Sequence, residues 1–421
     1  MVWPCVTAIA QRPTALRAGT ATEQIAIGGY VTSTYSNYQT GITQGSDGVL
    51  WFTEDFSNRI GRITTAGAVT EYRVPTADSE PLSITPGPDG ALWFTEVMGN
   101  NIGRITTLGV ISEYPVPTAD GEPWGIVAGP DGALWFTENI GDKIGRITTA
   151  GAITEYTVPT ASSRPSWIAA GPDGALWFTE ALGNSIGRIT TLGVISEFPL
   201  TAGASPGGIT AGPDGALWFT EAGLNNIGRI STGGVVTEYG VPTANSLPYD
   251  ITAGPDGALW FTEFDGLRIG RVTTTWAFAE YPVPTDIGAP GGIASASDGS
   301  LWFTGSALHG YLQKAIGQVA FVTAGLAVSP ASGPYNTSLT FSGDAFSPNE
   351  TVTIYRGGIG SAALARATAD DGGSFRHISR ACLVLRSPVL SGSWPDQWQY
   401  RSSPVRDHSA VDGKSDFRAG G

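Results

Sequence analysis

The sequence contains few of the residues that most often carry chemistry. Of 421 residues, two are cysteine and three are histidine. Cys5 and Cys382 lie at opposite ends of the chain in irregular segments, so neither a disulfide framework nor a zinc site is expected. No apolar run reaches the roughly 18 residues that a membrane-spanning helix needs, so no membrane span is predicted.

Charge is also scarce, and it is biased toward acid. Charged residues make up 14% of the chain, and the formal net charge is −14. Nucleic acid is therefore not expected as a partner, because phosphate binding needs a basic stripe. Residues 1–19 lack a charged start and carry only a short, interrupted apolar stretch, so they do not predict an export signal.

Glycine, proline and tryptophan are abundant by contrast, with 58, 28 and 13 copies. Disordered chains lack aromatic residues, and long helices exclude glycine and proline. The combination predicts an all-β protein of many short strands joined by tight turns.

A phrase of about 42 residues recurs seven times along the chain. Its tryptophans are separated by 42, 42, 42, 41, 42 and 42 residues. They are Trp51, Trp93, Trp135, Trp177, Trp218, Trp260 and Trp302. The common phrase runs I-T-x-G-P-D-G-A-L-W-F-T-E, then N-x-I-G-R-I-T-T, then I-x-E-Y-x-V-P-T-A.

Each unit predicts four strands. The segment L-W-F-T-E has bulky residues on both faces, as expected for a sheet that is covered on both sides. The glycine in I-G-R-I-T-T is expected to allow close approach by a neighbouring sheet. The last segment, for example residues 153–156, mixes apolar and polar residues and suits an outer edge.

Sheets that cannot bury both faces alone must stack, either radially as a β-propeller or linearly as a solenoid with polar caps. The chain ends favour the propeller. Residues 30–35 match only the fourth strand of the unit, whereas residues 316–319 match the third, after which the pattern stops. The sequence therefore predicts a seven-bladed β-propeller in which an N-terminal strand closes the last blade.

Residues present in nearly every unit have a structural explanation first. The tryptophans are expected between blades, where truncation to alanine would cost about 3–5 kcal/mol. A side chain repeated in six blades is expected to brace loops or to pair locally rather than to act at one site. This applies to Glu54, Glu96, Glu138, Glu180, Glu221 and Glu263, and to Arg62, Arg104, Arg146, Arg188, Arg229 and Arg271.

Four segments are predicted along the chain. Residues 1–28 form an irregular N-terminal segment, and residues 29–323 form the propeller. Residues 326–375 alternate like strands and resemble bacterial immunoglobulin-like modules, although a complete β-sandwich usually needs about 100 residues. Residues 376–421 are rich in arginine and serine without strand periodicity, as expected of a disordered or out-of-frame tail.

The repeated phrase of residues 29–323 closely resembles the virginiamycin B lyase (streptogramin lyase) family. Members of that family are seven-bladed propellers closed by an N-terminal strand. They linearise type B streptogramin antibiotics by Mg-dependent elimination at an ester bond. The resemblance implies the same fold for this chain and raises the possibility of the same reaction.

The family's active-site positions are changed in this sequence. Tyr249 stands where the lyases have a histidine. The phrase 289–291, Ala-Pro-Gly, replaces the Glu-Pro-His that supplies a metal ligand and the catalytic base, and Ser306 replaces a second metal-binding glutamate. Elimination needs a base and a group that holds the developing negative charge. We therefore assign no catalytic residue and no metal site, and keep His309 as a candidate base for a rearranged site.

The residues around the proline that opens each unit differ between blades, which makes them better candidates for function. Glycines there leave room in two blades, at Gly207, Gly208, Gly291 and Gly292. A concave, partly aromatic surface with few charges is typical of a small-molecule, peptide or glycan site, although the same residues could simply plug the centre of the ring. The candidate ligand-binding residues are Glu122, Trp124, Arg164, Trp167, Tyr249 and Asp250.

The seventh unit is irregular. Trp302 is 16 residues from Gln318, whereas the corresponding distance in the other units is 11 residues. The extra residues fall within 305–314, which include His309. Drift of a terminal unit and a purposeful lid are both open explanations.

Three hypotheses of function follow. The first is a non-catalytic binding or interaction propeller, monomeric and without a cofactor. The second is a Mg-dependent lyase with a rearranged site that uses His309. The third is a structural cell-surface module. The compartment is open, because the appended module favours an extracellular or cell-surface location whereas the lyases act inside cells.

Overall fold

The computed structural model consists of β-strands and their connections wherever it describes the chain. The described residues are 24–31, 41–64, 67–285, 287–306, 315–322, 325–329, 339–344, 351–356, 363–368, 375–379 and 398–403. No helix occurs among them. The contacts divide the chain into one unit of residues Ala26–Ala320 and a second that contains the strands from β29 onward.

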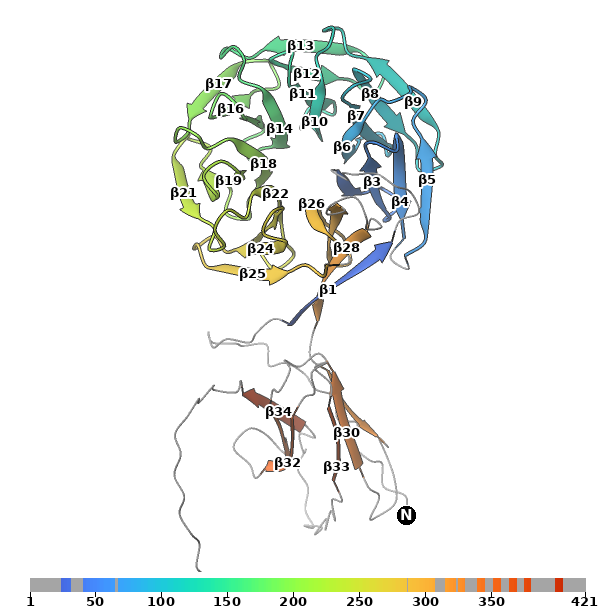
Figure 1. The fold of residues 1–421 in the computed structure, drawn as a ribbon, viewed down its shortest axis with the longest axis vertical. Helices are drawn as coiled ribbons and strands as arrows, with labels where there is room; N and C mark the ends of the chain where they lie inside the picture. Colours follow the sequence, from blue (N-terminus) through green and yellow to red (C-terminus); the bar gives the residue numbers. More distant parts are fainter. Residues whose placement is uncertain are drawn as a thin grey trace, which may run out of the picture. The chain divides into compact units, whose positions relative to one another are not determined.

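The first unit is a seven-bladed β-propeller, as predicted (Figure 1). Every blade is a four-stranded sheet, and in blades 1 to 6 all strands pair antiparallel and the inner strand comes first in the chain. Blade 1 contains β2 (Ile42–Gln44), β3 (Leu50–Glu54), β4 (Arg59–Ile63) and β5 (Val69–Arg73); blade 2 contains β6 (Pro81–Pro86), β7 (Leu92–Glu96), β8 (Asn101–Ile105) and β9 (Ile111–Pro115); blade 3 contains β10 (Pro123–Ala128), β11 (Leu134–Glu138), β12 (Lys143–Ile147) and β13 (Ile153–Thr157). Blade 4 contains β14 (Pro165–Ala170), β15 (Leu176–Glu180), β16 (Ser185–Ile189) and β17 (Ile195–Pro199); blade 5 contains β18 (Pro206–Ala211), β19 (Leu217–Glu221), β20 (Asn226–Ile230) and β21 (Val236–Gly240); blade 6 contains β22 (Pro248–Ala253), β23 (Leu259–Glu263), β24 (Arg268–Val272) and β25 (Phe278–Pro282).

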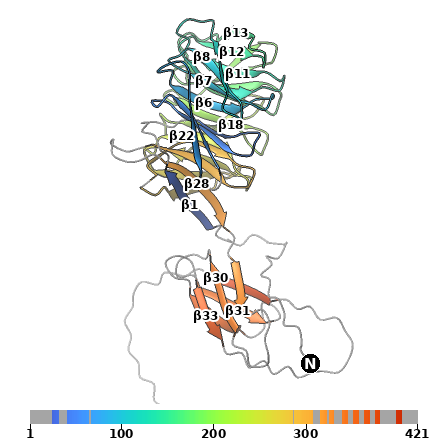
Figure 2. The same cartoon turned by 90° about the vertical axis from the view of Figure 1, so that its right-hand side faces the viewer.

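Blade 7 is closed by the two ends of the propeller sequence. Its strands are β26 (Ala289–Ser295), β27 (Leu301–Ser306), β28 (Ala315–Val322) and, at the outer edge, β1 (Gln24–Val31), which lies beside β28 in both views (Figures 1 and 2). The closure is confirmed, but the predicted strand start at Tyr30 is wrong, and so is the irregular assignment of residues 24–28. The strand can begin at Gln24 because β28 has eight residues, three more than the third strands of blades 1 to 6, and so offers a longer ladder.

The hydrophobic core lies between blades, as expected from the tryptophans. Trp51 of blade 1 packs with Ile84, Leu92 and Phe94 of blade 2. The same arrangement seals the ring, because Trp302 of blade 7 belongs to a cluster with residues of blade 1. All seven tryptophans are fully buried, so each interface between blades depends on one of the largest side chains available.

The glycine in the third strand of each blade admits an aromatic ring from its own sheet. Gly103 pairs with Phe94 of the adjacent strand, and a β-carbon on Gly103 would collide with the Phe94 ring. The expected approach by a neighbouring sheet is therefore wrong. The ring folds over the backbone of its cross-strand partner, a position open only to glycine.

The repeated arginines pair locally in blades 1 to 6, as predicted. In blade 2, Asp89 of the tight turn accepts one hydrogen bond from Trp93 Nε1 at 3.0 Å and another from Arg104 Nε at 2.7 Å. The Arg104 guanidinium also lies 5.8 Å from the centre of the Trp93 ring. Turn, core and third strand are thus joined by one motif that the repeat copies around the ring.

The second unit contains two three-stranded sheets. One has the order β29 (Gly325–Ser329), β30 (Leu339–Asp344), β33 (Phe375–Ser379), and the other β32 (Ala363–Thr368), β31 (Thr351–Arg356), β34 (Trp398–Ser403). β34 and most of β33 lie within 376–421, where no strand periodicity is predicted. Trp398 and Tyr400 alternate with polar residues, which suits the strand that pairs with β31. The immunoglobulin-like assignment of residues 326–375 stays a prediction.

Candidate functional site at the start of the inner strands

The residues that vary between blades lie in a β-bulge. In β10 the register with β11 shifts between Pro123 and Ile126, and the same shift follows the opening proline in β14 and β22. Trp124, Trp167, Tyr249 and Asp250 all occupy this two-residue bulge. A bulge re-aims side chains that regular pleating would fix, so the framework provides positions that can vary without disturbing the ladder.

A threonine from the second strand holds each bulge in place. Thr262 Oγ1 accepts the Asp250 N–H at 3.1 Å and donates to the Gly291 carbonyl of the next blade at 2.7 Å. The hydroxyl thus satisfies one orphan backbone donor and one acceptor at once. Thr53, Thr95 and Thr137 make the same pair of bonds, which couples the inner strands of successive blades.

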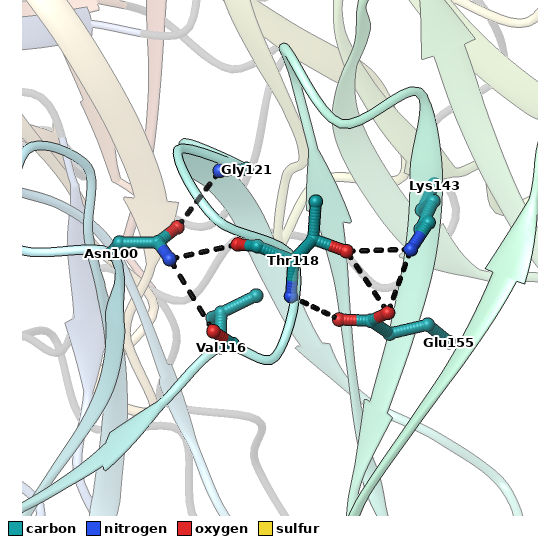
Figure 3. A network of polar contacts seen from close by, with 6 residues as sticks. All are labelled: Asn100, Val116, Thr118, Gly121, Lys143 and Glu155. Carbon is teal, nitrogen blue, oxygen red and sulfur yellow. Dashed lines mark hydrogen bonds and ion pairs between the residues drawn. The ribbon is translucent and has the colours of Figure 1, made fainter.

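The loop that leads to Glu122 and Trp124 is clamped from two blades (Figure 3). Asn100 Nδ2 donates to the Thr118 carbonyl at 2.9 Å, while its Oδ1 accepts the Gly121 N–H at 3.0 Å. On the other side, Glu155 accepts both the Thr118 N–H and the Thr118 hydroxyl at 2.9 Å. Glu122 itself has a left-handed backbone, with φ 50°, but Glu80 and Leu247 share it, so this conformation belongs to the repeat.

Two of the predicted aromatic residues meet across an intervening blade. Trp167 of blade 4 and Tyr249 of blade 6 form an edge-to-face pair with ring centres 6.0 Å apart. Blade 5 has Gly207 and Gly208 at the corresponding positions, so it places no side chain between them. Phe264 extends the cluster, with its ring centre 6.2 Å from that of Tyr249.

Phe264 is a member of this aromatic cluster that the sequence did not lead us to expect. It directly follows the L-W-F-T-E strand of blade 6, where the other blades have Asp55, Val97, Asn139, Ala181 and Ala222. Because the residue at this position differs from blade to blade, the sequence itself could have indicated Phe264 as a candidate.

Asp250 lies beside this aromatic cluster and is held by backbone donors. Its Oδ1 accepts the Ile251 N–H and its Oδ2 accepts the Ile293 N–H of blade 7, both at 2.9 Å. Burial raises the pKa of Asp250 to about 6, although these two hydrogen bonds act in the opposite direction. Burial, and then the negative charges of Asp250 and Asp55, raise the pKa of the Tyr249 phenol, so Tyr249 is neutral.

The other predicted residues form a second group on blades 3 and 4. Arg164 donates from a guanidinium nitrogen to Asn139 Oδ1 at 3.2 Å, and the Glu122 carbonyl accepts the Asn139 N–H at 2.9 Å. Trp124 is half-buried in the bulge of β10. Within the described residues, the contacts join Arg164 to Asn139 and Trp167 to Tyr249 but do not join these two groups to each other.

The positions that correspond by resemblance to the lyase site lie on adjoining strands of blades 6 and 7. Asp250, next to Tyr249, bonds to β26 through Ile293, and Ala289 of β26 pairs with Ser306 of β27. The side chains at Tyr249, Ala289, Gly291 and Ser306 offer a neutral phenol, a methyl, no side chain and a hydroxyl. His309 lies outside the described residues.

The part of the chain that the structure describes contains no group of three or more histidine, cysteine, aspartate or glutamate side chains placed to hold a metal ion. Nor does it contain a helix of the length and apolarity needed to cross a bilayer.

The fold and its repeat define a propeller of the lyase type, and comparison with known proteins identifies the family. The model of the virginiamycin B lyase family matches residues 25–313, so the chain belongs to that family. A streptogramin B lyase structure is 41% identical, with a TM-score of 0.67, over 71% of this chain and 98% of that one. A selenomethionine-substituted virginiamycin B lyase from Staphylococcus aureus is 42% identical over 71% and 100% of the two chains, with a TM-score of 0.66.

A third similar structure concerns catalysis directly. It is a catalytically inactive histidine-to-alanine variant of the Staphylococcus aureus lyase with quinupristin, 42% identical over 71% of this chain and 100% of that one, with a TM-score of 0.67. No curated protein matches the sequence with significance.

Proposed function

We propose that this protein is a non-catalytic binding propeller of the virginiamycin B lyase family, with a small-molecule, peptide or glycan site at the start of its inner strands. Trp124, Trp167 and Tyr249 supply apolar contact, and Glu122, Arg164 and Asp250 orient the ligand. The observation that carries the proposal is the bulge, since it presents different side chains on an otherwise repeated framework.

The chemistry at the former lyase positions supports binding over turnover. A base that removes a proton near neutral pH must accept that proton readily. The Tyr249 phenol is neutral and has its pKa raised further, and a glycine stands where the family has its catalytic base. Removal of one histidine accompanies the loss of activity in the Staphylococcus aureus lyase variant, and residues 24–306 of this chain contain no histidine.

A thermal-shift panel of peptides, glycans and small molecules tests the proposal. A ligand that raises the melting temperature of the parent protein should lose most of that effect in Trp167→Ala and in Tyr249→Leu. Leu192→Ser is the matched control, because Leu192 is exposed in a turn at the opposite end of a blade. A ligand that shifts all of these proteins equally would place its site elsewhere.

The alternative is a Mg-dependent streptogramin B lyase with a rearranged site, which family membership favours. His309 is then the candidate base, and acids near the starts of the inner strands, such as Asp250, would act with it. Ring opening of a type B streptogramin that disappears in His309→Ala would establish this alternative.

A further inference from the structure

Blades 1 to 4 each expose an apolar side chain at the same position, which is Phe56 in blade 1, with an exposed fraction of 58%. Met98, Ile140 and Leu182 each lie two residues after the second strand, in the turn to the third strand of blades 2, 3 and 4. Their exposed fractions are 61%, 41% and 64%. We call these three residues the apolar crest. Single exposed apolar residues are ordinary, but a row on consecutive blades is typical of an interaction surface.

The crest lies beside the loops that enter the inner strands. The Met98 N–H donates to the Ser79 carbonyl, and the Ile140 N–H donates to the Gly121 carbonyl, both at 3.1 Å. Leu182 makes the same bond to Ser163. The crest and the loops that carry Glu80, Glu122 and Arg164 therefore share one face of the propeller.

The loops into blades 2 and 3 give that face a negative charge. Residues 74–80 and 116–122 contain four acids and no basic residue. Burial, and then the charges of Asp55, Glu122 and Asp78, raise the pKa of Glu80 above its usual range, as expected where like charges lie close together. Arg164, in the loop into blade 4, is already bonded to Asn139.

The opposite ends of the same blades are apolar without being acidic. Leu108 and Leu192 are 86% and 87% exposed in the turns before the fourth strands of blades 2 and 4. Residues 106–110 and 190–194 carry no charge, and the nearby Asp89 and Asp173 are paired with arginines. Of these two ends of the described blades, the crest end is the one that combines apolar exposure with excess negative charge.

We propose that the apolar crest docks a basic amphipathic peptide, whose apolar side chains cover Met98, Ile140 and Leu182 and whose lysines or arginines face Asp78, Glu80, Asp120 and Glu122. Charge complementarity selects this occupant. A second copy of this acidic chain, or an anionic lipid surface, would bring like charges together. The inference rests on the proposed binding function and names its partner class.

A fluorescein-labelled peptide of alternating lysine and leucine is the probe, followed by fluorescence anisotropy on the full chain. The crest variant is Met98→Ser with Leu182→Ser, and the matched control is Leu108→Ser with Leu192→Ser on the opposite ends of the same blades. A third variant, Asp78→Asn with Asp120→Asn, removes two exposed charges and keeps side chains that tolerate the left-handed backbone found there.

The crest variant should weaken peptide binding about tenfold or more, whereas the control should stay within about twofold of the parent. The aspartate variant should bind more weakly and lose affinity less steeply with salt. Equal binding of a glutamate–leucine peptide, or equal binding by parent and crest variant, overturns the proposal. If instead a panel ligand still depends on Tyr249 while the basic peptide fails, the central binding site stands and the crest inference alone is wrong.

Discussion

Two acidic residues recur in most blades, and their surroundings shift their pKa values in opposite directions. Burial opposes ionisation of Asp89 in the tight turn, yet its hydrogen bonds to Trp93 and Arg104 outweigh burial and lower its pKa. Glu96 at the end of the second strand is fully buried, and burial with the neighbouring Glu113 raises its pKa to about 8. The first acid is a charged brace, and the second is a protonated core residue.

These glutamates predict that alkali destabilises the propeller. The pKa values of Glu96 and Glu180 are raised to about 8, and those of Glu138, Glu221 and Glu263 to about 7. The folded state therefore binds more protons than the unfolded chain between their ordinary pKa of 4.5 and these values. Stability is full below that window and falls as pH rises through it, by at most about 1.4 kcal/mol per pH unit for each group.

Urea denaturation between about pH 5 and pH 9 measures this dependence. Glu180→Gln should flatten the curve, because one titrating group is gone. A free energy of unfolding that rises toward pH 9 would contradict the ionisation states described for these side chains.

At the scale of the strand, the threonine of L-W-F-T-E explains why the bulges are so regular. Thr262→Val would leave the Asp250 N–H and the Gly291 carbonyl without their partner, so we expect a loss of about 1–3 kcal/mol in the free energy of unfolding. Thr53→Val in blade 1 is the matched control. Both variants should lose similar stability, but only Thr262→Val should weaken binding of a ligand that depends on Tyr249, as calorimetry would measure.

A substitution at the first residue of the third strand of blade 4 is expected to stabilise the propeller. Lys143 of blade 3 pairs with Glu155 at 2.8 Å and Arg59 of blade 1 with Glu71 at 3.0 Å. Ser185 stands at this place in blade 4, and its hydroxyl donates to the Gly183 carbonyl instead. In Ser185→Lys the new ammonium should pair with Glu197, which stands where blade 3 has Glu155, and should gain about 0.5–1 kcal/mol in the free energy of unfolding. Ser185→Met, with a similar stem but no charge, should not show this gain in urea denaturation.

The strands could be predicted closely because each 42-residue unit contains residues typical of a tight turn, a buried strand and an edge strand. Seven copies of the unit give the same prediction. The closing strand was placed too late, since only its partner β28 reveals how far the ladder extends. The bulge and its threonine could not be predicted, because the threonine hydroxyl bonds to a carbonyl 29 residues later, on the next blade. Variation at the opening proline did indicate Trp167 and Tyr249, but their contact depends on the curvature of the ring.

The stability of the propeller depends on the pairing of β1 with β28, which closes blade 7. Deleting residues 24–31 removes the outer strand of blade 7 and the hydrogen bonds to β28, so we expect a loss of at least about 2 kcal/mol and a less cooperative transition. Thermal unfolding followed by tryptophan fluorescence reports on this directly, since the tryptophans lie between blades. Deletion of residues 404–421 is the control and should leave the propeller transition unchanged.

We propose that this chain keeps the framework of the virginiamycin B lyase family while its inner-strand residues bind a ligand rather than react with it. The most direct measurement is incubation of the purified protein with a type B streptogramin and Mg²⁺, followed by liquid chromatography with mass spectrometry. Elimination leaves the atomic composition unchanged, so the linear product is recognised by its retention and fragments rather than by its mass. We expect that only the cyclic antibiotic is recovered, whereas steady accumulation of the linear isomer above the protein-free rate would contradict a purely binding role.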